Sequence, residues 1–72
     1  MEQIVTATKR ENGIDVQYEK KSDIKGIFLS YSELIDMKVN ALDLLGNPMM
    51  YLFDEKNRSI RMSPEKSAKK KG

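Results

Sequence analysis

The 72-residue chain contains neither cysteine nor histidine. The lack of cysteine excludes disulfide bonds, and without either residue type the usual zinc ligands are missing. A histidine general base and a cysteine nucleophile are excluded as well, and the serines match no nucleophile-elbow pattern. The sequence therefore predicts a protein that is not an enzyme, that holds no metal or other cofactor and that has no small-molecule substrate.

Long apolar segments are also missing. No apolar run exceeds five residues, whereas a membrane-spanning helix needs about 20. The N-terminus, Met1-Glu2-Gln3-Ile4, lacks the basic segment and apolar run of a signal peptide. We therefore expect a cytoplasmic protein that does not contact a membrane, and the absence of cysteine suits that reducing compartment.

The excess positive charge lies at the C-terminal end. Residues 1–63 hold nine Lys/Arg and ten Asp/Glu, a net charge of −1, whereas residues 64–72 carry a net charge of +3. These last residues have no apolar periodicity, so we expect one compact domain over 1–63 and a disordered lysine-rich tail over 64–72. A domain this small buries a small core, which favours a homodimer as a further source of stability.

The first third of the chain predicts a β-hairpin over residues 3–20. Asn12-Gly13 is the sequence expected at a type I′ turn. A two-residue loop there places Arg10 opposite Asp15. It also gathers one apolar face, made of Val5, Ala7, Ile14, Val16 and Tyr18. A polar connection over 20–25 and a short strand over 26–29 are expected to follow.

A helix and a second hairpin are expected in the rest of the domain. Ser30 or Ser32 can begin a helix that runs to Leu45 and ends at Gly46-Asn47-Pro48. Alternatively, Asn40 begins a shorter helix over 41–45, with residues 33–39 extended. Residues 49–62 predict the second hairpin, with a charged turn. The expected fold is thus α+β, a small ββ-β-α-ββ domain with two antiparallel hairpins packed on one helix.

Part of the chain resembles a known family. The residues that carry the resemblance are Ala41-Leu-Asp-Leu-Leu-Gly-Asn-Pro48, Met50-Tyr-Leu-Phe-Asp-Glu-Lys-Asn-Arg-Ser-Ile-Arg-Met62 and Ser63-Pro64. Over residues 26–64 the chain is similar to AbrB-like swapped-hairpin proteins, especially small phage and prophage relatives. The resemblance implies an intertwined dimer that binds DNA as a regulator in the host cytoplasm.

Basic residues are the candidates for contacts with DNA phosphates. They lie near the first turn, on the second hairpin and in the tail, and comprise Lys9, Arg10, Lys56, Arg58, Arg61, Lys69, Lys70 and Lys71.

A second hypothesis is a phage-encoded inhibitor or adaptor that binds a host protein, for example in an anti-defence or anti-CRISPR role. The near-neutral body favours this hypothesis. It predicts a contact through a sheet edge, or through a patch around Asp36, Asn40 and Asp43.

Overall fold

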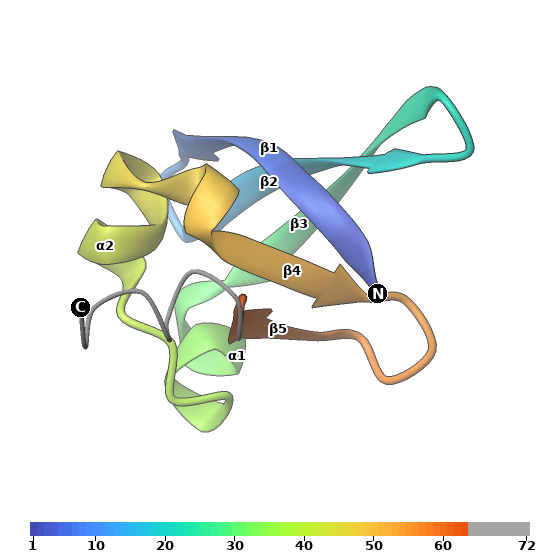
Figure 1. Ribbon diagram of the computed structural model, residues 1–72. Coiled ribbons are helices and arrows are strands. Elements are labelled where there is room, and N and C mark those ends of the chain that lie inside the picture. The colour runs from blue at the N-terminus through green and yellow to red at the C-terminus, as the bar shows by residue number, and fades with distance from the viewer. Residues whose placement is uncertain (64–72) are drawn as a thin grey trace, which may run out of the picture.

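The computed structural model describes residues 1–63 and contains five strands, two short α-helices and one 3-10 helix. Their order along the chain (Figure 1) is β1 (Glu2–Lys9), β2 (Gly13–Lys20), β3 (Asp23–Ser30), α1 (Tyr31–Asp36), α2 (Ala41–Gly46), η1 (Pro48–Met50), β4 (Tyr51–Asp54) and β5 (Ser59–Met62). The predicted tail over 64–72 lies outside the described residues. No helix within residues 1–63 is long and apolar enough to cross a membrane.

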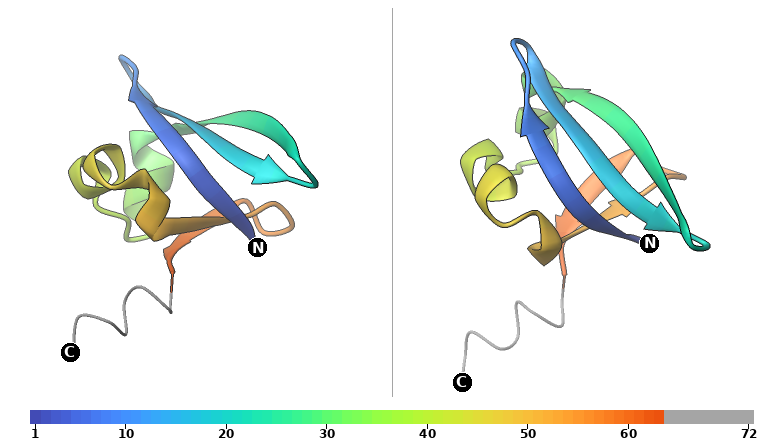
Figure 2. Two further views of the ribbon diagram at one scale, coloured as in Figure 1. Left: turned by 45° about the horizontal axis from the view of Figure 1, so that its top comes forward. Right: turned by 90° about the horizontal axis from the view of Figure 1, so that it is seen from above.

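All five strands pair antiparallel in one sheet of order β3-β2-β1-β4-β5. Three hairpin-connected strands are followed by a long connection that brings β4 beside β1, which is a Greek-key arrangement. The three long strands form a curved layer, the β4–β5 hairpin crosses beneath it, and the helices lie at the end away from the β2–β3 turn (Figure 2). The predicted α+β class is confirmed.

The first hairpin forms, but the predicted turn position is wrong. The strands pair with Lys9 opposite Ile14, and the Arg10 backbone N–H donates to the Gly13 carbonyl at 2.8 Å, so the chain reverses at Glu11-Asn12. Neither Asn12 nor Gly13 has a positive φ. Glycine is needed at position 13 because a Cβ there would meet backbone atoms of the next strand, including the Cα of Ser30 at 2.7 Å.

The apolar face of this hairpin is confirmed except at one position. The register is displaced by two residues from the predicted one, and an even shift keeps each side chain on its face. An irregularity between Ile4 and Thr6 then changes the alternation, so that Ile4 is fully buried and Val5 only partly. This extra residue in β1 has the effect of a β-bulge.

The predicted connection over 20–25 is shorter than expected. Lys21 and Ser22 have φ values of 49° and 72°, as both central residues of a type I′ turn require. Lys20 pairs with Asp23 across this turn, and β3 therefore runs over eight residues beside β2. The first three residues of β3 were not predicted as strand, because Asp23 and Lys25 interrupt the apolar pattern of a strand.

The single long helix predicted over 30–45 is wrong, since the chain forms two helices. Ser30 caps α1 through a capping box with Glu33, and Asn40 caps α2 by accepting a hydrogen bond from the Asp43 N–H. Between them, Lys38 has a φ of 62° and occupies the αL position of a Schellman motif. The alternative with Asn40 as a cap is thus right for α2 and wrong in extending 33–39.

The predicted end of the second helix also differs. Gly46 is the last residue of α2 and has no positive φ, so it is not an αL cap. Pro48 begins η1, which takes Met49 and Met50 out of the predicted strand, and β4 begins at Tyr51. Proline suits this place because the first residue of a helix needs no backbone donor.

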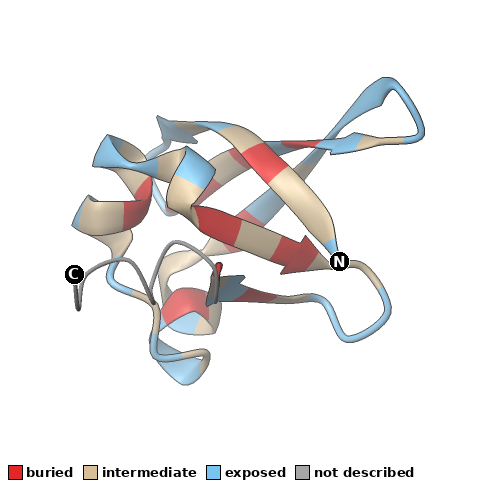
Figure 3. Ribbon diagram, in the orientation of Figure 1, coloured by how far each residue is buried: buried red, intermediate tan, exposed pale blue. Residues whose placement is uncertain are grey.

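The core lies inside the curved sheet and is closed at one end by α1 and α2 (Figure 3). It consists of ten buried residues from both hairpins, β3 and both helices: Ile4, Ile14, Val16, Tyr18, Leu29, Leu34, Leu44, Tyr51, Phe53 and Ile60. The rings of Tyr18 and Phe53 meet with centroids 4.8 Å apart. The β2 strand and the β4–β5 turn are joined further by Glu55, which accepts hydrogen bonds from the Tyr18 hydroxyl at 2.7 Å and from Lys20.

Candidate functional site: the outer face of the three-stranded layer

The predicted DNA-contacting residues do not form one basic surface in the described part of the chain. Arg10 is paired with Asp15, and Arg58 is paired with Glu33. Lys9 is exposed at the end of β1, Lys56 in the β4–β5 turn and Arg61 on β5. Lys69, Lys70 and Lys71 lie outside the described residues.

Arg58 joins three elements by its guanidinium group. Its Nε and Nη2 donate to the Glu33 carboxylate at 2.9 and 3.3 Å, and Nη2 also donates to the Phe28 carbonyl of β3 at 3.0 Å. The Glu33 carboxylate in turn accepts the Ser30 backbone N–H at 3.0 Å. Arg58 chiefly, with the Ser30 N–H, lowers the pKa of Glu33 from 4.5 to about 2.

We predict a pH dependence from this ion pair. A lowered pKa in the folded state means that the ionised carboxylate stabilises the fold above pH 4.5, and that this contribution is lost as the pH falls towards 2. The free energy of unfolding of the wild type should therefore decrease more steeply over this range than that of Glu33→Gln. Urea denaturation at a series of pH values measures both.

The variant is a matched control because glutamine can still accept the Ser30 N–H in a capping box. The carboxylates of Asp54 and Glu55, whose pKa values are also lowered, are common to both proteins and cancel in the difference. Parallel pH profiles would contradict the assigned role of Glu33.

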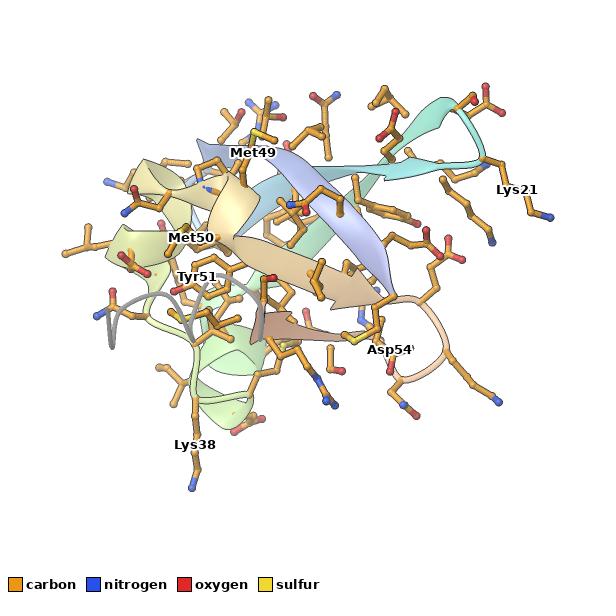
Figure 4. All side chains as sticks on the ribbon, in the orientation of Figure 1. Lys21, Lys38, Met49, Met50, Tyr51 and Asp54 are labelled. Atoms are coloured by element: carbon orange, nitrogen blue, oxygen red, sulfur yellow. The ribbon has the colours of Figure 1, made fainter. Side chains whose placement is uncertain are left out.

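The predicted acidic patch around Asp36, Asn40 and Asp43 is not formed as one helical stripe. Asn40 caps α2, and the Asp43 carboxylate accepts hydrogen bonds from the Tyr51 hydroxyl and from Asn47. Burial chiefly, and then Asp43, raises the pKa of Tyr51 to about 12. Asn40, Asp43 and Tyr51 line a pocket of about 590 Å³, to which Asp36 does not contribute. The exposed Lys38 lies at the same pocket, and its side chain points away from the body (Figure 4).

Acidic side chains elsewhere serve local structure. Asp54 accepts the backbone N–H groups of Lys56 and Asn57 and so stabilises the β4–β5 turn. Among residues 1–63, no group of three acidic, histidine or cysteine side chains is placed to hold a metal ion.

A second hollow lies on the outer face of β1, β2 and β3, the side of this layer that faces away from the core. It has a volume of about 360 Å³ and is lined by Thr8, Arg10, Asp15, Val16, Gln17, Gly26, Ile27 and Phe28. The ladder places Phe28 opposite Asp15, Gly26 opposite Gln17 and Ile24 opposite Glu19. Because alternate residues of a strand share a face, Ile24, Gly26 and Phe28 form one row on the outer face, which we call the β3 row.

The two apolar members of the β3 row are unusually open. Ile24 is 54% exposed and Phe28 is 41% exposed, although both belong to a regular strand. The Phe28 ring reaches towards Gly13, since a Cβ at that glycine would be 2.7 Å from the ring's Cζ. The row thus presents one aromatic and one aliphatic side chain to solvent.

No local feature of the fold requires glycine at position 26, between these two residues. Its φ is not positive, the β2–β3 register has no bulge at this position, and a Cβ would meet nothing closer than the Val16 carbonyl oxygen at 3.9 Å. Glycine inside a strand costs about 0.5–1 kcal/mol relative to alanine. Glycine in a strand often marks a bulge, a tight bend or the close approach of another molecule, and at Gly26 neither a bulge nor a clash is present.

The β3 row was missed by the sequence analysis. The alternation Ile24-x-Gly26-x-Phe28 would have indicated a strand with an apolar outer face, had the strand been recognised as beginning at Asp23. Comparison with known protein families, characterised proteins and solved structures finds no match. The resemblance to AbrB-like proteins therefore stays a prediction.

Proposed function

We propose that this chain is a small non-enzymatic protein-binding module, of the inhibitor or adaptor type, that holds its partner on the outer face of β1, β2 and β3. The observation that carries the proposal is the β3 row. There a glycine with room for a side chain lies between two exposed apolar residues. A surface of this kind leaves room for a partner side chain over Gly26, in contact with both Ile24 and Phe28.

The chemistry of the hollow suits a protein surface. Its two charged residues, Arg10 and Asp15, neutralise each other by their ion pair. Thr8 and Gln17 add uncharged polar groups, while the exposed Phe28 ring supplies an apolar anchor. Interfaces between proteins are depleted in charge at their centre and enriched in aromatic residues. The hollow therefore resembles the centre of a protein interface more closely than a phosphate-binding groove.

Site-specific photocrosslinking tests the proposal. A benzophenone analogue of phenylalanine in place of Phe28 should form a discrete adduct with another protein in the cells that produce this chain. The same analogue in place of Ile35, which is 72% exposed on α1, is the control and should not form that adduct. The adduct must survive nuclease treatment and differ in mass from two linked copies of the chain.

Three outcomes would overturn the proposed protein-binding function: no adduct at position 28, the same adduct at positions 28 and 35, or an adduct that nuclease removes. The last would favour nucleic acid, which is the second candidate. Five-stranded Greek-key barrels of the OB type bind oligonucleotides, and an exposed aromatic ring can stack on a base. This support is an analogy of fold, and the net charge of −1 over residues 1–63 weighs against it.

Binding to nucleic acid has its own measurement. Fluorescence anisotropy with labelled random duplex and single-stranded DNA, at two salt concentrations, compares the full chain with a chain ending at Ser63. A DNA-binding regulator should bind through residues 1–63 at physiological salt, and Arg58→Ala with Arg61→Ala should abolish that binding. Binding by the full chain alone, and only at low salt, would be the non-specific attraction of lysines to phosphates.

A further inference from the structure

The β3 strand leaves a row of backbone groups without partners along its outer edge. The Tyr31 N–H donates to the Asn12 carbonyl at 3.0 Å. In an antiparallel ladder every second residue bonds to the neighbouring strand, so this bond determines which residues of β3 bond to β2. Lys25, Ile27 and Leu29 therefore bond to β2, while Ile24, Gly26 and Phe28 direct their N–H and C=O groups away from it. Arg58 approaches the Phe28 carbonyl from that side, in agreement with this direction.

This edge has few of the features that usually prevent strands from associating. Sheet edges are commonly protected by proline, by bulges, by very short strands or by charged side chains, lysine above all. Of these features β3 carries two charged residues, Asp23 and Lys25, and both lie on the face opposite to the β3 row. The β3 strand contains no proline, pairs with β2 without a bulge and is eight residues long. The Arg58 side chain protects one end of the edge only. In the described part of the chain, no residue bonds to the N–H or C=O groups of Ile24 and Gly26.

We infer that two copies of this chain pair antiparallel through β3, with Gly26 on the two-fold axis. Ile24 then lies opposite Phe28 of the partner subunit on the outer face, and Gly26 opposite Gly26 of the partner subunit. An aliphatic side chain across from an aromatic one stabilises an antiparallel pair. The two sheets become one continuous sheet, in which the two β3 rows lie side by side. The inference concerns the assembly of the chain and goes beyond the proposed function.

The other registers of this pairing are less favourable. With Lys25 on the axis, two lysines lie directly opposite each other, which is destabilising. With Ile24 on the axis, the pairing extends to Ser22, whose φ of 72° is not extended. With Ile27 on the axis, Ser30 must pair, and its N–H already donates to Glu33. With Gly26 on the axis, residues 24–28 of the two copies pair with one another without opposed lysines, and Ser22 and Ser30 lie beyond the paired span.

Arg58 is compatible with this register. Ile24 of the partner subunit would donate its N–H to the Phe28 carbonyl, which already accepts from Arg58. A carbonyl oxygen has two lone pairs and can accept both bonds. The contact between two strands of this length is small, so we expect reversible association rather than a permanent dimer.

Cysteine trapping tests the inference, because the natural chain has no cysteine and gives no background. Directly opposed residues of a hydrogen-bonded antiparallel pair have Cα atoms about 5.5 Å apart, within the range that a disulfide spans. Gly26→Cys should therefore form a disulfide-linked dimer rapidly under mild oxidation. Thr8→Cys, exposed on β1 two strands from the edge, is the control and should crosslink at least about tenfold more slowly.

A second variant removes the edge itself. Ile24→Pro deletes an N–H that points away from β2, so the β2–β3 ladder stays intact, whereas Ile24→Val keeps the N–H and is the matched control. Sedimentation equilibrium should show self-association of the wild type and Ile24→Val, and its loss in Ile24→Pro. Equal crosslinking of both cysteine variants, a wild type that is monomeric at every concentration, or a dimer that survives Ile24→Pro would overturn the inference. A monomer that still forms the protein adduct from position 28 would leave the proposed function intact.

Discussion

Replacement of Phe53 by alanine is expected to unfold most of the protein at 25 °C. The Phe53 side chain is 1% exposed and packs on the Tyr18 ring in the core. Removing a buried phenylalanine costs about 3–5 kcal/mol, and a domain of this size has a total stability of only a few kcal/mol. Far-ultraviolet circular dichroism during urea denaturation measures the loss.

Phe28→Ala is the matched control for this experiment. Both residues are phenylalanines in strands, but Phe28 lies on the outer face and is 41% exposed. Its replacement should change the free energy of unfolding by about 1 kcal/mol or less. If Phe28→Ala destabilised the protein as much as Phe53→Ala, the assignment of the outer face as a surface without a role in folding would be wrong.

Gly13→Ala is expected to destabilise the fold by about 3 kcal/mol, the upper part of the range for overpacked sites. The new Cβ would overlap the Leu29 carbonyl oxygen and lie 2.7 Å from the Ser30 Cα. Both are backbone atoms of β3, so no side-chain rotation relieves the contact. The β2–β3 ladder would have to separate at this end, which also disturbs the cap of α1 at Ser30.

The matched variant Gly26→Ala should be neutral or stabilising by up to about 1 kcal/mol, because alanine restricts the unfolded chain and meets no neighbour in the folded one. Urea denaturation of the two variants beside the wild type makes the comparison. If Gly26→Ala destabilised the protein as much as Gly13→Ala, the fold itself would require glycine at position 26.

The sequence was sufficient to predict elements whose signals are local. The alternation of apolar residues over 14–18 indicated the inner face of β2, and it was confirmed because a register shift of two residues preserves the faces. Asn40 was weighed as a helix cap, and it caps α2. The second hairpin was expected over residues 49–62, and β4 and β5 pair within that range, with Phe53 opposite Ile60.

The errors arose where tertiary contacts override a local signal. Asn12-Gly13 has the sequence of a type I′ turn, yet the chain reverses at Glu11-Asn12, and Gly13 lies in β2 where it packs closely against β3. The first helix ends before Lys38, where the sequence has no glycine to indicate a helix end. The chain breaks there because Leu34 and Leu44 both pack into the core.

Of the two arginines that form ion pairs, Arg10 was predicted to face its partner Asp15, whereas the partner of Arg58 was not predicted. Arg10 and Asp15 lie on either side of the first turn, so their proximity was readable from the sequence, whereas Arg58 and Glu33 are 25 residues apart and only the fold brings them together. The β3 row was beyond prediction for a related reason. The significance of Gly26 depends on knowing that its surroundings have room for a side chain, and this is a property of the folded structure alone.

The most direct test of the protein-binding role is Gly26→Val combined with photocrosslinking from position 28. Valine favours a strand, so the free energy of unfolding should equal or exceed that of the wild type, while the side chain fills the space that a partner would occupy. The proposed function predicts a stable protein whose adduct yield falls at least about tenfold, a loss of roughly 1.4 kcal/mol or more in binding. An undiminished adduct in a stable Gly26→Val protein would contradict it.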